Sequence, residues 1–135
     1  MKNVILIIIV VLLSTTLEIV AQNTVYANFK DGRVEYYYKD NLIETQYQDG
    51  LIVTYEYKNN CLSKATSSTG FYTKYFWEEC RSTETFFSPG NKKIGIRKFK
   101  NNSLIKETYF NESGKEILKK QAEEIYNLQD NLKIY

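Results

Sequence analysis

The side chains that could carry out chemistry in this 135-residue chain are acidic residues, cysteines and tyrosines, because histidine is absent. Without histidine there is no Ser-His-Asp or Cys-His triad, no histidine zinc site and no usual general base for neutral pH. Glu78 and Glu79 look like a carboxylate pair, but adjacent residues of a strand point to opposite faces, which favours a solvated turn. A carboxylate hydrolase would need two acids converging from separate strands, and no spacing predicts this. We therefore expect a non-enzymatic protein without a cofactor or a metal site.

The two cysteines, Cys61 and Cys80, are too few for a zinc site. In an exported protein, two cysteines favour a disulfide. They begin and end a predicted hairpin around Gly70, so they could approach across its base. A two-residue loop at Thr69 and Gly70 would set them about 7 Å apart on a diagonal, which is hard to bridge without a bulge. The disulfide is thus predicted from the compartment, and two free thiols are the alternative.

Aromatic residues are the informative excess, with 12 tyrosines, 7 phenylalanines and 1 tryptophan. One interpretation is structural, because cross-strand aromatic pairs stiffen a thin sheet. The other is a contact surface, since Tyr and Trp bury well and also form hydrogen bonds at interfaces. A single-layer sheet cannot cover both of its faces, so a C-terminal helix or another molecule must lie on it. The candidate binding residues are Tyr36, Tyr38, Tyr47, Tyr55 and Tyr57.

Regularly spaced turn residues must position these side chains. The glycines of five predicted turns are 18, 20, 20 and 24 residues apart, and the turns between them are 19, 20 and 22 residues apart. Two interleaved series with one period predict a unit of about 20 residues, made of two strands and two kinds of turn. The glycine turns are centred on Gly32, Gly50, Gly70, Gly90 and Gly114, and the others on Asn41, Asn60, Cys80 and Asn102.

The segments between these turns have the composition of strands. In residues 51–57, Leu51, Val53, Tyr55 and Tyr57 fall on one face and polar residues on the other, as in a half-buried strand. We predict a mainly β fold, an antiparallel meander of about four to five hairpins over residues 22–112. The alternative is a small closed β-barrel that would enclose an apolar ligand.

The C-terminal residues 113–135 change to a helical period. Leu118, Ala122, Ile125, Gln129 and Leu132 are spaced to share one helix face. Ser113 followed by Glu116 fits a capping box, which would start a capping helix near Gly114. The competing interpretation makes residues 116–120 one more strand.

The N-terminal residues 1–21 are typical of a signal peptide. A basic start is followed by an apolar run from Val4 to Leu13, and Ala21 precedes a plausible cleavage point. A retained membrane anchor is the alternative, but the run is short for a bilayer, which takes about 20 residues. With a lysine-, asparagine- and isoleucine-rich composition, this predicts an exported bacterial protein that is periplasmic, on the cell surface or secreted. The net charge of +2 is too balanced to argue for nucleic acid or an anionic membrane as the main partner.

Two stretches carry a family resemblance: EYYYKDNLIETQYQDGLIVTYEY at residues 35–57 and KKIGIRKFKNNSLIKETYFNESGKEI at residues 92–117. They resemble MORN-type repeats, and more closely bacterial antitoxin-family proteins with MORN-like repeats. The resemblance covers most of residues 26–117. It implies an elongated sheet of hairpins used for binding, with no catalytic residues. We therefore expect a binding module whose partner is another protein or a cell-surface component; the alternative is a lipid or small-ligand carrier with a barrel cavity.

Overall fold

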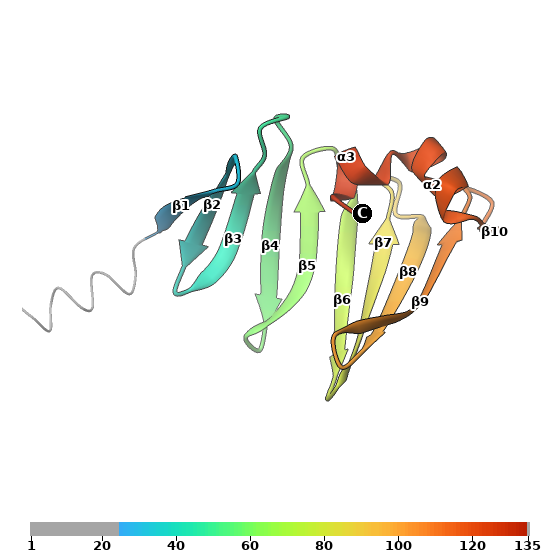
Figure 1. The fold of residues 1–135 in the computed structure, drawn as a ribbon, viewed down its shortest axis with the longest axis horizontal. Coiled ribbons are helices and arrows are strands. Elements are labelled where there is room, and N and C mark those ends of the chain that lie inside the picture. The colour runs from blue at the N-terminus through green and yellow to red at the C-terminus, as the bar shows by residue number, and fades with distance from the viewer. Residues whose placement is uncertain (1–24, 135) are drawn as a thin grey trace, which may run out of the picture.

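Residues 25–134 of a computed structural model form a single antiparallel sheet of ten strands with two short helices at its C-terminal end (Figure 1). The order of the strands across the sheet is their order in the chain. The predicted signal peptide, residues 1–21, lies outside the described residues. The strands are β1 (Tyr26–Lys30), β2 (Arg33–Tyr38), β3 (Asn41–Gln46), β4 (Ile52–Lys58), β5 (Cys61–Ser67), β6 (Tyr72–Glu78), β7 (Arg81–Phe87), β8 (Lys93–Lys100), β9 (Ser103–Phe110) and β10 (Glu116–Ile117).

The predicted meander of hairpins is confirmed, and the sheet is open. Its two edges are β1 and β10, which do not pair with each other. A barrel requires the first and last strands to close the hydrogen-bonded ring. The alternative of a small closed barrel is therefore wrong.

Tight two-residue turns join the strands at the end of the sheet that is lowest in Figure 1. In three of them both turn residues have positive φ, with values between 48° and 62°. This is the type I′ geometry that matches the twist of a hairpin, and Asn and Asp tolerate it. The three turns are Lys39-Asp40, Asn59-Asn60 and Asn101-Asn102. The first lies one residue earlier than the predicted turn at Asp40-Asn41.

At the opposite end another two-residue turn, Asp31-Gly32, joins β1 to β2. The other four turns there are wider and share one hydrogen-bond pattern. The first residue of each donates its N–H to the carbonyl four residues later and accepts from the N–H three residues later. The residue that donates this second bond, three positions after the first, adopts positive φ: it is Gly50, Gly70, Asn91 or Gly114. Such a type I turn with a following left-handed residue is a common hairpin connection. In the third turn Asn91, and not the predicted Gly90, takes the left-handed position.

The C-terminal segment differs from the predicted helix over residues 113–135. Residues 116 and 117 form β10 on β9, so the competing strand interpretation was right for that stretch. Helix α2 (Lys119–Tyr126) begins only afterwards, and α3 (Leu128–Leu132) follows it. Ser113 donates to the Asn111 side chain within a turn and does not cap a helix.

The buried face of these helices also differs from the predicted one. Leu118 is 72% exposed and Ile125 53% exposed, whereas Tyr126 and Leu128 are buried. Leu118 is the N-cap and so precedes the helix, and within α2 the buried face runs through Ala122 and Tyr126, four residues apart. Asn127, with a left-handed φ of 47°, then ends α2 and turns the chain. A helical period extrapolated through this residue points to the wrong side of the second helix.

The main core lies between the helices and one face of β7–β9. Phe86, Ile94 and Tyr109 from the sheet pack with Ala122, Tyr126, Leu128 and Ile134 from the C-terminal segment. Ile94 is the extra residue of a β-bulge, since Phe86 pairs with Gly95 and Phe87 with Lys93. Gly95 makes room for the rings, because a Cβ there would lie 2.9 Å from Tyr109 Cδ1 and 3.0 Å from Phe86 Cδ2.

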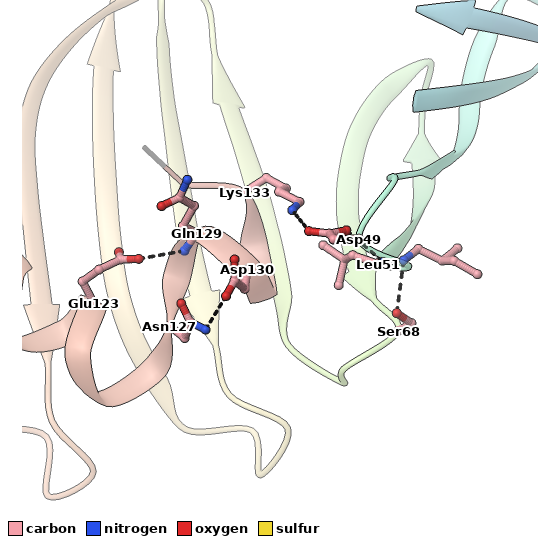
Figure 2. Close-up of polar contacts among 9 residues, drawn as sticks. Asp49, Leu51, Ser68, Glu123, Asn127, Gln129, Asp130 and Lys133 are labelled. Atoms are coloured by element: carbon pink, nitrogen blue, oxygen red, sulfur yellow. Dashed lines mark hydrogen bonds and ion pairs between the residues drawn. The ribbon is translucent and has the colours of Figure 1, made fainter. Parts of the chain in front are cut away.

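A polar contact ties the end of the chain to the β3–β4 turn (Figure 2). The Lys133 ammonium bonds to the Asp49 carboxylate and lies 4.8 Å from the centre of the Tyr47 ring. Tyr47 in turn packs against a small second cluster of Leu51, Val53 and Ala65. The C-terminal segment therefore connects the two halves of the sheet.

The predicted disulfide is not formed. Cys61 and Cys80 are free and exposed. Cys61 starts β5 beside the turn at Asn59-Asn60, whereas Cys80 lies in the separate turn between β6 and β7. The wide turn around Gly70 fixes the β5–β6 register, with Lys64 opposite Lys74, and this register does not place the two cysteines opposite each other.

Candidate functional site

The two faces of the sheet differ, because the helices cover part of one face only. Side chains alternate between a helix-bearing face and an open face that carries no secondary structure among the described residues. Figure 1 shows α2 and α3 over one end of the C-terminal half of the sheet only. The other end of the helix-bearing face, near the two-residue turns, is left uncovered.

Four aromatic residues occupy equivalent positions on this uncovered area. Each lies on the strand that leads into a two-residue turn, opposite a residue of the return strand. Trp77 is 51% exposed, which is much for so large an apolar side chain. We call this row the aromatic strip: Tyr37, Tyr57, Trp77 and Phe99.

Contacts to the preceding hairpin hold the rings of the strip. The Tyr57 hydroxyl donates to the Leu42 carbonyl at 3.0 Å, and Trp77 Nε1 donates to the Leu62 carbonyl at 2.7 Å. These two bonds are the same contact made one 20-residue unit apart. Tyr26 stacks beside Tyr37 and Tyr75 beside Trp77, with ring centres 5.3 Å and 6.4 Å apart. What the strip offers to another molecule is therefore the ring surface that these neighbours leave free.

The first end of the strip adjoins a charged cluster on β2. Glu35 is 6% exposed and accepts from Arg33 Nε and from the Tyr37 hydroxyl, both at 2.7 Å. The hydrogen bond from Tyr37, and next the one from Arg33, hold the pKa of Glu35 below its usual value. Tyr37 therefore contributes its ring to the aromatic strip and its hydroxyl to a hydrogen bond with the buried Glu35 carboxylate.

The other end adjoins a second charged cluster. Arg97 lies between the strands of Glu84 and Glu107, and its Nη1 is 3.6 Å from Glu84 Oε2. Its guanidinium also lies 5.1 Å from the centre of the Phe99 ring. Burial raises the pKa of Glu84, and the positive charge of Arg97 offsets part of this rise. The cation between the two acids makes this an ion-pair row; it does not set two carboxylates facing each other.

Replacing Tyr37 with phenylalanine is expected to remove a pH-dependent part of the stability. A carboxylate with a lowered pKa stabilises the fold above its unfolded value of about 4.3, and this contribution is lost as the pH falls through the folded pKa. The deficit of Tyr37→Phe in free energy of unfolding should therefore be larger at pH 7 than near pH 3. Denaturant melts at both pH values measure it. Tyr36→Phe, on the opposite face, is the control, and an equal deficit of Tyr37→Phe at both pH values would contradict the role of Glu35.

The five tyrosines expected at a binding surface are separated by the fold. Tyr55 and Tyr57 lie on the helix-bearing face, and Tyr47 lies on it under the C-terminal segment, where it packs against the second cluster. Tyr36 and Tyr38 lie on the open face, opposite Glu44 and Asn41. Of the five, only Tyr57 belongs to the aromatic strip.

Sequence reasoning missed Tyr37, Trp77 and Phe99. A shift of one 20-residue unit from Tyr57 leads to Tyr37 and Trp77, so the repeat period contained a signal for these two. The same shift does not lead to Phe99, because the last unit is longer and Phe99 follows Trp77 by 22 residues.

Other kinds of site find no support in the described part of the chain. Residues 25–134 contain no group of three or more Cys, Asp or Glu side chains that could hold a metal ion. In the same range neither helix has the length and hydropathy that spanning a bilayer requires. In comparisons with known proteins, the sequence matches no protein-family model, and no curated protein matches it.

Proposed function

We propose that the chain is an exported, non-enzymatic binding module that engages a partner protein through the aromatic strip. The observation that carries the proposal is the repetition of an aromatic ring at one position in four hairpins, exposed at Trp77 and half-buried at the other three. Tyr and Trp are the residues that most often dominate binding energy at protein interfaces. Export rests on the predicted signal peptide at residues 1–21.

The fixed rings favour binding energetically. Association costs free energy for each flexible side chain that becomes ordered, about 0.5–1.5 kcal/mol. Tyr57 and Trp77 are already held by hydrogen bonds to Leu42 and Leu62 in the free protein. A partner that stacks on them avoids much of this cost.

The resemblance to MORN-type repeat proteins supports the same proposal, because it implies a hairpin sheet used for binding. The alternative of a lipid carrier needed a barrel interior, and the open sheet provides none. The cleft that Tyr55 and Tyr75 line beside Leu132 is small and half open. No observation on the described residues favours a carrier.

Replacing Trp77 with alanine is expected to weaken partner binding by about 30-fold or more, which corresponds to about 2 kcal/mol, the usual threshold for an interface hot spot. The partner is first identified by photo-crosslinking in the native host, with benzoylphenylalanine in place of Trp77. Trp77 is the only tryptophan of the chain, so a blue shift of its emission on titration with the purified partner reports direct contact.

Phe76 provides the matched control, because it neighbours Trp77 on β6, is 61% exposed and points to the open face. Benzoylphenylalanine at position 76 should not give the adduct, and Phe76→Ala should bind normally. Equal crosslinking from both positions, or unchanged affinity in Trp77→Ala, would refute the aromatic strip as the binding surface.

A further inference from the structure

The open face of β5–β9 has a strong charge imbalance. Alternation along the strands places seven basic side chains on it and one acidic side chain, Glu78. We call this surface the basic face. Its lysines are Lys64, Lys74, Lys93, Lys98, Lys100 and Lys106, and its arginine is Arg81.

The helix-bearing face of the same five strands has the opposite balance. It carries one cation, Arg97, and two acids, Glu84 and Glu107. The net charge of +2 for the whole chain therefore conceals a separation of charge between the two faces. The amino-acid composition cannot show this separation, because only the strand register determines on which face of the sheet each charged side chain lies.

The register also places cations directly opposite one another. Residues opposed across an antiparallel pair lie about 4.5–5.5 Å apart, and like charges there destabilise the sheet. The opposed pairs are Lys64 with Lys74, Lys98 with Lys106, and Arg81 with Lys100. Among the described residues the only ion pair of these six cations joins Lys64 to Glu56, at 3.3 Å. Glu78 lies opposite Arg81 on the side away from Lys100, so the uncompensated cost falls mainly on the pair of Lys98 and Lys106.

Aromatic rings hold several of these lysines in place. The ammonium groups of Lys64 and Lys74 lie 5.2 Å from the Tyr72 ring and 5.3 Å from the Phe87 ring, respectively. The two rings are stacked on each other with centres 4.8 Å apart. Cation–π contacts of this kind fix the direction of a flexible side chain.

The surface between the lysine pairs can donate hydrogen bonds. Thr83 and Thr85 lie between the two lysine pairs, and Thr108 lies next to Lys106 in a shallow hollow whose rim includes Glu116. Hydroxyl and ammonium groups together suit the oxygens of phosphate, for which lysine acts as a point charge.

We propose that the basic face binds a linear phosphate polymer that has no bases. Five adjacent strands span about 19 Å at about 4.8 Å per strand, so a single phosphate would reach one lysine pair and a chain would reach all three. Proteins that bind single-stranded nucleic acid stack successive bases on free aromatic rings. Here Tyr72 and Phe87 are stacked on each other and covered by lysines, which leaves only Phe76 exposed among the rings of β6 and β7 on this face.

The first test measures binding of inorganic polyphosphate by titration calorimetry at several salt concentrations. The full sequence is expressed, and mass spectrometry of the purified protein establishes its N-terminus. Lys98→Gln/Lys106→Gln should weaken binding at least about tenfold and lower the slope of log affinity against log salt by about 1–2. Lys115→Gln/Lys120→Gln makes the same change of charge outside the basic face and should leave both values unchanged. Equal losses in the two variants, or no binding by the wild type at low salt, would overturn the proposal.

The second test uses the opposed lysines themselves. Lys106→Glu turns the pair with Lys98 into opposite charges, so it should raise the melting temperature while it weakens polyphosphate binding at least about tenfold. Polyphosphate should raise the melting temperature of the wild type more than that of the variant. A lower melting temperature of the ligand-free variant, or unchanged affinity, would count against the basic face.

Two further ligands distinguish binding of a base-free phosphate polymer from binding of nucleic acid or of an anionic membrane. Single-stranded DNA of equal charge, or vesicles of anionic lipid, should bind more weakly than polyphosphate at the same salt concentration. Tighter binding of either would overturn the choice of a base-free polymer. Trp77 lies on the other face, so its emission should stay unchanged on addition of polyphosphate, and the outcome is independent of the aromatic strip.

Discussion

Replacing Phe86 with alanine should lower the free energy of unfolding by about 3–5 kcal/mol, the range measured for large-to-small changes of buried aromatic residues. Phe86 is 2% exposed and packs in the main core between β7 and the helices. Its ring also fills the space left by the missing side chain of Gly95. Little nearby can collapse into the cavity, because Tyr109 already occupies the other side of that glycine. Urea denaturation followed by circular dichroism measures the change.

Phe76→Ala removes the same side chain from the exposed face of the neighbouring strand β6. We expect a change within about 0.5 kcal/mol, as for most surface substitutions. Similar losses in the two variants would mean that the helix-covered face is not the main core of the sheet.

Deleting residues 118–135 should abolish the cooperative unfolding transition of the C-terminal half. The deletion removes the burial of Tyr126, Leu128 and Ile134 and uncovers Ile94 and Tyr109. Burying one large apolar side chain contributes about 1.5–3 kcal/mol, so three of them are comparable with the whole stability of a small domain, about 5–15 kcal/mol. Thermal melts, together with binding of a hydrophobic dye, report the loss.

Lys133→Ala is the control for this deletion. It removes the contact with Asp49, whose side chain is 48% exposed, but leaves the apolar residues in place. Ion pairs at the surface contribute only about 0–1 kcal/mol. A deletion mutant that still melts cooperatively at nearly the wild-type temperature would contradict the role given to the C-terminal core.

Turn chemistry made most of the fold predictable from sequence. Asn59-Asn60 and Asn101-Asn102 lie in hairpin turns because asparagine tolerates the positive φ of type I′ geometry. The same property misled the prediction at Pro89-Gly90, where Asn91 took the position expected of a glycine. The period of about 20 residues was visible because every unit repeats the same pair of turns.

The C-terminal segment and the sites were harder to predict, because they depend on long-range placement. The residue pattern did not fix which face of α2 packs on the sheet, and Tyr126 rather than Ile125 is buried; Asn127 then ends the helix before Leu128. Opposition of Lys98 and Lys106 depends on a bulge near Phe99, which shifts the register by one residue. Tyrosine content indicated an aromatic surface, but only the strand register separates Tyr57 from Tyr36.

The tie between Lys133 and Asp49, 84 residues apart in the chain, can form only after all the residues between them have been synthesised. Each hairpin pairs strands that are neighbours in sequence, so pairing can begin as soon as those strands leave the ribosome. Phe86, Ile94 and Tyr109 stay uncovered until residues 119–134 have been synthesised. Until then the growing chain exposes an apolar sheet face, the kind of surface that makes incompletely folded chains prone to aggregate. Docking of residues 119–134 on β7–β9 covers that face.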